Sequence, residues 1–164
     1  EELQKKQELM IAKISKKKLP LTPEEYGKYY KICDSLPFAF TDIEMVFNEE
    51  KKAVDWIFRY GNEALATLEK LPLDKMIGNS FSSLFSNMDA KWLHVYERAT
   101  LYGETLEIMD YSPEIDTNLK IICFPTFPGH CGCILFNADK MKSISEENHL
   151  VRLAAVALKS NPTI

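Results

Sequence analysis

Alternating apolar residues predict five β-strands, and apolar residues at helical spacing predict the helices between them. The strands are expected at about 38–47, 53–60, 104–111, 118–126 and 130–137. Two short helical turns, at 62–71 and 73–78, and a longer helix at 87–102 follow the second strand. This order places helices over one face of an antiparallel sheet, so the sequence predicts an α+β fold.

The first two predicted strands differ in how regularly apolar and polar residues alternate. In the first, the alternation breaks at Asp42, which predicts a β-bulge or a change of face. The second strand is expected to be half buried, with Asp55 and Arg59 on its polar face. Its apolar face is predicted to consist of Val54, Trp56, Phe58 and Tyr60.

Capping residues predict where the helices begin. Thr22 and Glu25 form a capping box around Pro23, so a helix is expected from there to about Asp34. Asn62 is a suitable cap for the first short turn. Ser86-Asn-Met-Asp89 is a second capping pattern, before the longer helix. That helix carries an apolar stripe made of Trp92, Val95, Tyr96 and Ala99.

The ends of the chain are predicted to be helical appendages. Residues 1–18 are polar with a short apolar stripe, so they are expected to pack on another chain or continue an upstream helix. A solvated, frayed terminus is the alternative. Ser143 and Glu146 form a capping box that predicts a C-terminal helix. The domain organisation is therefore predicted as an N-terminal helix, a connecting helix, a core domain and a C-terminal helix, at 1–18, 19–35, 36–139 and 140–164.

Composition limits the classes of protein to consider. The chain has 164 residues, of which 46% are hydrophobic, which suits one domain with appendages. A net charge of −4 argues against a general nucleic-acid surface. No apolar run is long enough to span a membrane, and no signal peptide is recognisable. The first residue is not Met, so an excised piece of a longer protein is expected.

Four cysteines are the first candidates for chemistry. They are too few and too unevenly spaced for a disulfide framework, which favours a reducing cytoplasm. A zinc site needs four converging ligands, whereas Cys131 and Cys133 share one face of one strand with no second pair. His130 and Cys131 are neighbours on a strand, so their side chains point apart. Small side chains packed beneath the helices are the favoured interpretation, and no metal site is predicted.

Carboxylates and single histidines are the other candidates. Asp110, Glu114 and Asp116 form an acidic loop, but the spacing is not that of a calcium loop, so solvated acids in a turn are expected. His94 and His149 lie on predicted helices, where surface or packing roles are usual. No glycine-rich phosphate loop and no nucleophile elbow occur, so this segment is not expected to be an enzyme.

The order of elements, together with several short motifs, resembles a PAS domain. Tyr60-Gly-Asn-Glu-Ala64 is similar to the entry to the first helices of this family. Leu73-Asp-Lys-Met-Ile-Gly78, followed by Ser80-Phe-Ser-Ser-Leu-Phe85, is similar to the next segment. Trp92, Gly103-Glu104 and Asp110-Tyr-Ser-Pro-Glu114 resemble PAS modules found upstream of diguanylate cyclase (GGDEF) or histidine kinase domains. The resemblance covers about residues 36–139.

The resemblance implies a PAS fold with a five-stranded antiparallel sheet and a pocket between sheet and helices. Phe58, Trp92, Tyr96, Ile121 and Cys133 would point into it, with core packing as the alternative for each. Flavin-photoreceptor members carry a reactive Cys after a Gly, where this chain has Gly78-Asn-Ser-Phe81. Haem-binding members use a His on the long helix, whereas His94 lies outside the apolar stripe. No cofactor is identified, and neither flavin nor haem is expected.

By resemblance, the expected function is a sensory module that binds a small ligand or a partner. It would form a homodimer and signal through its flanking helices to an output domain outside this segment. A diguanylate cyclase or a histidine kinase would supply that domain. The first alternative is a PAS dimerisation module without a ligand. The second is an enzyme that uses Cys131 or Cys133. A cytoplasmic location is expected, or the cytoplasmic part of a membrane-attached protein.

Overall fold

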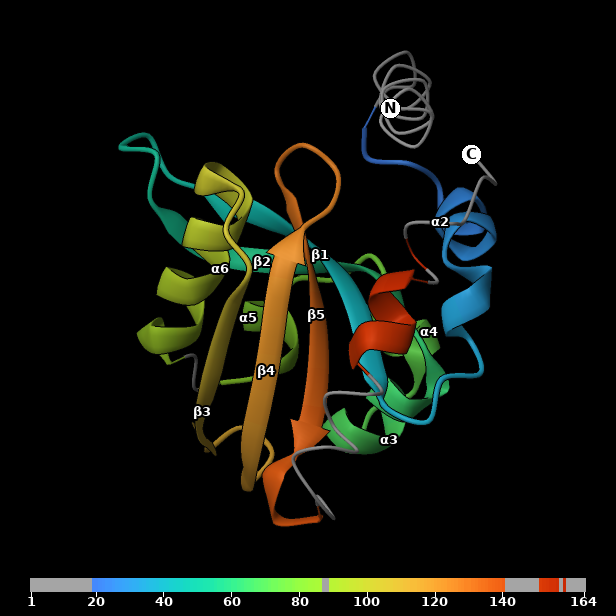
Figure 1. The fold of residues 1–164 in the computed structure, drawn as a ribbon. Helices are drawn as coiled ribbons and strands as arrows, with labels where there is room; N and C mark the ends of the chain where they lie inside the picture. The colour runs from blue at the N-terminus through green and yellow to red at the C-terminus, as the bar shows by residue number, and fades with distance from the viewer. Residues whose placement is uncertain (1–18, 87–88, 141–150, 157, 159–164) are drawn as a thin grey trace.

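A computed structural model describes residues 19–86, 89–140, 151–156 and 158. Their centre is one five-stranded antiparallel sheet with strand order β2-β1-β5-β4-β3 (Figure 1). The predicted strands are confirmed, with shifts of one or two residues at their ends. The observed bounds are β1 Ala39–Phe47, β2 Ala53–Gly61, β3 Leu106–Ser112, β4 Thr117–Pro125 and β5 His130–Asn137.

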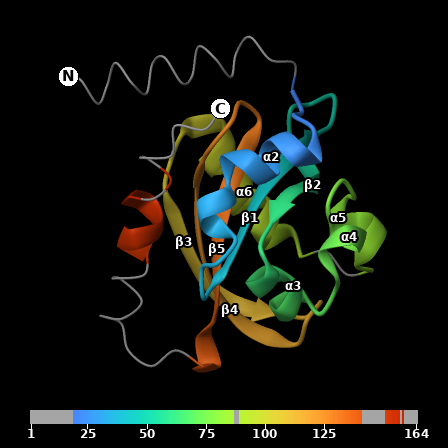
Figure 2. The same cartoon turned by 90° about the vertical axis from the view of Figure 1, so that its right-hand side faces the viewer.

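Helices cover both faces of this sheet (Figure 2). One face packs against α3 Glu63–Glu69, α4 Leu73–Met76, α5 Phe81–Leu84 and α6 Ala90–Tyr102. The other packs against α2 Pro23–Tyr29, the 3₁₀ turn η1 Lys31–Cys33 and helical residues 151–156. A second 3₁₀ turn, η2 Ala138–Lys140, follows β5. Because both faces are covered, seven consecutive residues of β5 are buried and its sequence shows no polar alternation.

The two faces bury separate apolar clusters. The helix-side core lies beneath α6, and its members include Trp56, Phe58, Trp92, Tyr96, Ile121 and Cys133. The outer core lies beneath α2, and its members include Tyr26, Tyr30, Phe40, Tyr60, Phe127 and Ile134. Alternate residues of β5 supply one cluster and then the other, as the two-residue period of a strand requires.

The caps predicted for α2 and α3 are confirmed. The side chain of Thr22 accepts a hydrogen bond from Glu25 N, and Glu25 accepts one from Thr22 N, which completes the predicted capping box. Asn62 caps α3 by accepting from Leu65 N at 3.0 Å. The prediction for α6 was wrong by three residues, because Asp89 caps it and the helix begins at Ala90.

The predicted face of β2 was also wrong in part. Phe58 pairs with Ile43 and Tyr60 with Asp42, so Arg59 is an extra residue in β2. This is the bulge expected near Asp42, and it turns Tyr60 onto the outer core. Val54, at the start of the strand, is 45% exposed. Only the middle of β2 therefore contributes to the helix-side core.

Gly132 of β5 is a position where a side chain does not fit. A Cβ there would lie 2.9 Å from two ring atoms of Phe124, whereas one at Gly27 in α2 would meet nothing within 4 Å. Gly132→Ala should lower the free energy of unfolding by about 1–2 kcal/mol. Gly27→Ala should raise it by about 0.5–1 kcal/mol through helix propensity. Urea denaturation of both variants checks this, and equal midpoints would contradict the packing described for Phe124.

Some sequence predictions fall outside the described residues. The N-terminal helix at 1–18 and the capping box of Ser143 and Glu146 are among them. Within the part that the structure describes, no helix has both the length and the apolar character needed to cross a membrane.

Candidate functional site

The structure brings together the five residues predicted to line a pocket. Phe58 lies on β2, Trp92 and Tyr96 on α6, Ile121 on β4 and Cys133 on β5. None is more than 4% exposed, and all belong to the helix-side core. Their convergence under α6 is what a pocket between sheet and helices would require. That they contact a ligand remains a prediction.

Two further aromatic residues complete this core. The ring of Trp56 lies 4.3 Å from that of Phe81 and 5.0 Å from that of Tyr96, between centroids. Phe81 also stacks on Phe85 at 4.7 Å. These separations are typical of favourable aromatic pairs. Phe81 was not among the predicted pocket residues, because the four-residue helix α5 is too short to show a helical period.

Three thiols line the floor of the helix-side core. Cys123 and Cys133 are directly paired across β4 and β5, and Cys131 lies two residues from Cys133 on the same face. Burial raises the pKa of Cys123 to about 12 and that of Cys133 well above its ordinary value. A thiol with so high a pKa supplies little thiolate near neutral pH, which argues against a nucleophilic cysteine.

No group of three or more potential metal ligands is found among the described residues. The opposite directions predicted for His130 and Cys131 are confirmed, since His130 contacts Tyr26 of the outer core and Cys131 belongs to the helix-side core.

A buried carboxyl group lies at one end of this core. Glu69, at the end of α3, is 8% exposed. Burial, and next the charge of Glu114, raise the pKa of Glu69 to about 7. Burial is also the main reason why the pKa of Tyr96 is well above its ordinary value, and nearby thiols and Glu69 raise it further. The Tyr96 hydroxyl therefore keeps its proton as a potential donor.

Glu114 corrects the expectation of a solvated acidic loop. Asp110 and Asp116 are exposed, but one carboxylate oxygen of Glu114, Oε1, is buried without a partner in the described structure. Its other oxygen accepts a hydrogen bond from Ser112 Oγ at 2.6 Å. Unpaired buried carboxylate atoms are costly, so a nearby ligand that donates hydrogen bonds would be favoured. Glu69 looked like an ordinary surface residue in the sequence, and nothing local marked it.

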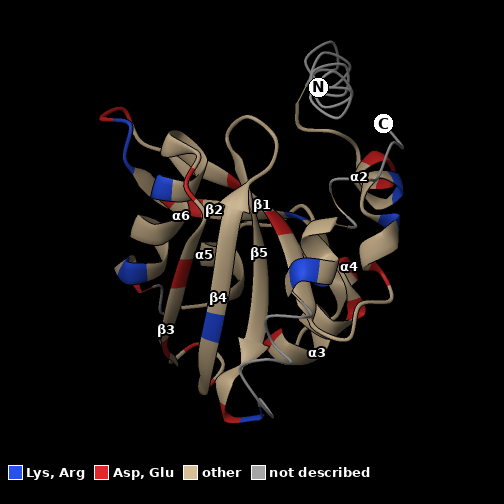
Figure 3. Cartoon of the chain, in the orientation of Figure 1, with Lys and Arg blue, Asp and Glu red and all other residues tan. Residues whose placement is uncertain are grey.

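In the view of Figure 3, positions of Lys and Arg are interspersed with positions of Asp and Glu along the described elements. Lys120 on β4 pairs with Glu107 on β3 at 2.8 Å, and Arg98 pairs with Glu104 at 2.6 Å. The exclusion of nucleic acid as a partner remains a prediction.

Comparison with known proteins identifies the fold. No protein-family model and no curated protein sequence matches the chain. The solved LOV protein of Rhodobacter sphaeroides matches with a TM-score of 0.57 at 14% identity, over 84% of this chain and 83% of that one. An RNA-binding light-oxygen-voltage receptor matches with a TM-score of 0.42 at 15% identity, over 85% of this chain and 40% of the receptor. The first likeness shows that the chain has the PAS fold expected from its sequence.

The same likeness corrects the prediction on cofactors. A flavin was not expected, because the segment at 78–81 lacks the reactive cysteine. Yet the solved structure that shares this fold is a LOV protein, and this finding contradicts that prediction. The residues present have the chemistry that a planar heteroaromatic ring needs. Trp56 and Phe81 supply aromatic rings, and Oε1 of Glu114 is a buried polar atom that has no partner in the described structure. The comparison says nothing about haem.

Proposed function

We propose that this chain is the sensory module of a larger signalling protein and binds a small ligand between α6 and the sheet. The observation that supports this most is the composition of the helix-side core. Aromatic rings and thiols make up this core, and near it lie the buried Glu69, whose pKa is raised to about 7, and Oε1 of Glu114, which has no partner in the described structure. Most ligand pockets combine such an apolar lining with a few polar groups. The ligand class that fits is a planar ring system with hydrogen-bond donors on its edge.

The mechanism is a shift between two arrangements of the module. A ligand that binds one arrangement better moves the equilibrium toward it, by as much as its affinities differ. A difference of about 1–3 kcal/mol is typical of such coupling. The change would pass from the core domain at 36–139 to the flanking helices predicted at 1–18 and 143–159. A homodimer and a downstream diguanylate cyclase or histidine kinase domain, in the cytoplasm, complete the proposal.

A thermal-shift experiment on the purified chain tests ligand binding. The probes are flavin mononucleotide, riboflavin, adenine and guanine, each at increasing concentration. A ligand at one hundred times its Kd should stabilise the fold by about 2.7 kcal/mol. Loss of a hydrogen bond to the ionised carboxyl should make Glu69→Gln weaken binding about tenfold or more. The matched control is Leu101→Ala, since Leu101 lies on α6 but is 49% exposed.

A second function is favoured by one specific observation. Trp56, Phe81 and Tyr96 already contact one another through their rings, which suits a core filled by its own side chains. The chain would then be a PAS dimerisation module without a ligand. Absence of any thermal shift with all four probes, together with a concentration-dependent dimer in sedimentation, would favour this alternative over ligand sensing.

A further inference from the structure

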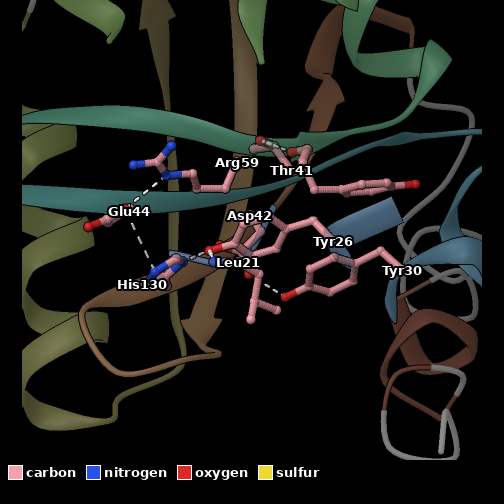
Figure 4. A network of polar contacts seen from close by, with 9 residues as sticks. Leu21, Tyr26, Tyr30, Thr41, Asp42, Glu44, Arg59 and His130 are labelled. Carbon is pink, nitrogen blue, oxygen red and sulfur yellow. Dashed lines mark hydrogen bonds and ion pairs between the residues drawn. The ribbon is translucent and has the colours of Figure 1, made fainter. Parts of the chain in front are cut away.

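A buried polar network fastens α2 to the outer face of the sheet (Figure 4). Its centre is Asp42 of β1, which is fully buried in the outer core. The hydroxyl of Tyr30, the C-cap residue that directly follows α2, donates to Asp42 Oδ2. On the other side, His130 Nδ1 lies 2.8 Å from Asp42 Oδ1. One carboxylate therefore joins α2 to β5, two elements that are far apart in the sequence.

The network determines the protonation state of each member. Burial, and next the charge of Asp42, raise the pKa of Tyr30 well above its ordinary value, so its hydroxyl keeps the proton that it donates. Asp42 Oδ2 accepts from Tyr30, and an ionised carboxylate has no proton to donate, so we assign Asp42 Oδ1 as the acceptor toward His130. Its bond to His130 requires a proton on Nδ1, which leaves a lone pair on Nε2. His130 is 1% exposed, and Nε2 has no hydrogen-bond partner among the described residues.

The ionisable groups that face His130 come from three elements. Glu44 of β1 places Oε1 at 4.0 Å from Nε2, and Arg59 of β2 donates from Nε to the same oxygen at 2.8 Å. From α2, the ring of Tyr26 lies 6.0 Å from the imidazole, and its hydroxyl accepts from Leu21 N at 3.2 Å. The remaining neighbour is the apolar ring of Phe127 in the β4–β5 turn. The imidazole ring thus lies between the Glu44 carboxylate, which is paired with Arg59, and the aromatic rings of Tyr26 and Phe127.

We propose that His130 is a proton-binding site that controls how firmly α2 is held on the sheet. A proton from solvent adds to the lone pair of Nε2, and no covalent bond breaks. The resulting imidazolium forms an ion pair with Asp42 and so reduces the negative charge available to the Tyr30 hydroxyl. The new N–H also needs an acceptor, and Glu44 must leave Arg59 to reach it. The first change weakens the Tyr30–Asp42 bond that holds the end of α2 against β1, and the second removes the Glu44–Arg59 contact between β1 and β2.

This role does not depend on a ligand in the helix-side core, because the network lies on the opposite face of the sheet. Its output is the position of α2, which is where the chain enters the domain from its N-terminal segment. Acidification would act on the N-terminal side of the module even if the ligand proposal failed.

Hydrogen exchange of α2, measured by NMR between pH 5 and 8, tests the proposal. The amides to follow are Tyr26 N and Tyr30 N, which donate to Thr22 O and Tyr26 O. After correction for intrinsic exchange, their protection should fall about tenfold as the His130 ring gains its proton. In His130→Gln the fall should disappear. In the control His94→Gln, which changes an exposed histidine of α6, it should persist.

A second variant covers the case in which His130→Gln does not fold. Glu44→Gln removes the anionic acceptor while leaving Asp42 and His130 in place. Loss of this nearby negative charge makes the imidazolium less favourable, so the fall in protection of α2 should move to lower pH. The proposal is wrong if His130 does not titrate between pH 5 and 8. It is also wrong if protection of α2 stays constant through that titration, or keeps its pH dependence in His130→Gln.

Discussion

Asp42→Ala should lower the free energy of unfolding by about 3–4 kcal/mol, as expected when a buried charged acceptor is removed from its partners. The carboxylate accepts from the Tyr30 hydroxyl and from His130, and all three side chains are at most 1% exposed. Alanine leaves both donors buried without an acceptor. Urea denaturation near pH 7 measures the loss as a lower midpoint. The slope of the unfolding free energy against urea concentration should be the same in both proteins.

The matched control for Asp42 is Glu44, two residues along the same strand. Its side chain is 28% exposed, and it pairs with Arg59 in contact with water. Glu44→Ala should therefore cost no more than about 1 kcal/mol. Equal losses in the two variants would mean that the Asp42 network contributes no more than an ordinary surface pair.

Glu69→Gln should remove a large pH dependence of stability. Burial, and next Glu114, raise the pKa of Glu69 from 4.5 to about 7 in the folded chain. Between pH 4.5 and about pH 7, Glu69 is therefore mostly protonated in the folded state and mostly ionised in the unfolded state. The carboxylate therefore destabilises the fold fully above pH 7, and this effect is relieved as the pH falls toward 4.5. A difference of about 2.5 pKa units corresponds to on the order of 3 kcal/mol.

The variant should accordingly be more stable than the wild type at pH 8, by on the order of 3 kcal/mol, with little difference near pH 4.5. Denaturant titrations at a series of pH values measure this. Glu63→Gln is the control, because Glu63 lies on the same helix but is exposed. A Glu69→Gln variant whose stability follows the wild-type pH profile would show that this carboxyl group titrates normally.

The sequence was sufficient for the parts of the fold that depend on neighbouring residues. The capping box of Thr22 and Glu25 and the cap of Asn62 on Leu65 N each span four residues. The alternation of apolar and polar residues, with a period of two, predicted the five strands. The motifs that resemble the PAS family lie between these strands in the expected order. The placement of Cys131 and Cys133 beneath the helices needed only the strand direction and their small size.

The features that could not be predicted depend on residues far apart in the chain. Asp42 and His130 are 88 positions apart, and only the register of β1 against β5 brings them together. A charged residue within an apolar strand is the available signal, and by itself it predicts a bulge or a change of face but no partner for the carboxylate. The face of Tyr60 was misassigned because a strict period of two does not allow for the extra residue Arg59.

Glu69 illustrates a different limit. In sequence it is a glutamate in the last turn of a short helix, a position that is normally solvated. Its burial results from the packing of α3 and from the nearby Glu114 of the β3–β4 turn. The flavin prediction failed for a related reason, since it rested on one missing cysteine and not on the shape of the fold.

Native mass spectrometry of the purified chain tests the central claim, which is that the helix-side core binds a small ligand. The expected result is one additional small molecule per chain, as purified or after incubation with flavin mononucleotide or adenine. That mass should be lost under denaturing conditions and greatly reduced in Glu69→Gln. The bare chain mass under every condition, from folded protein with all probes in excess, would contradict the account.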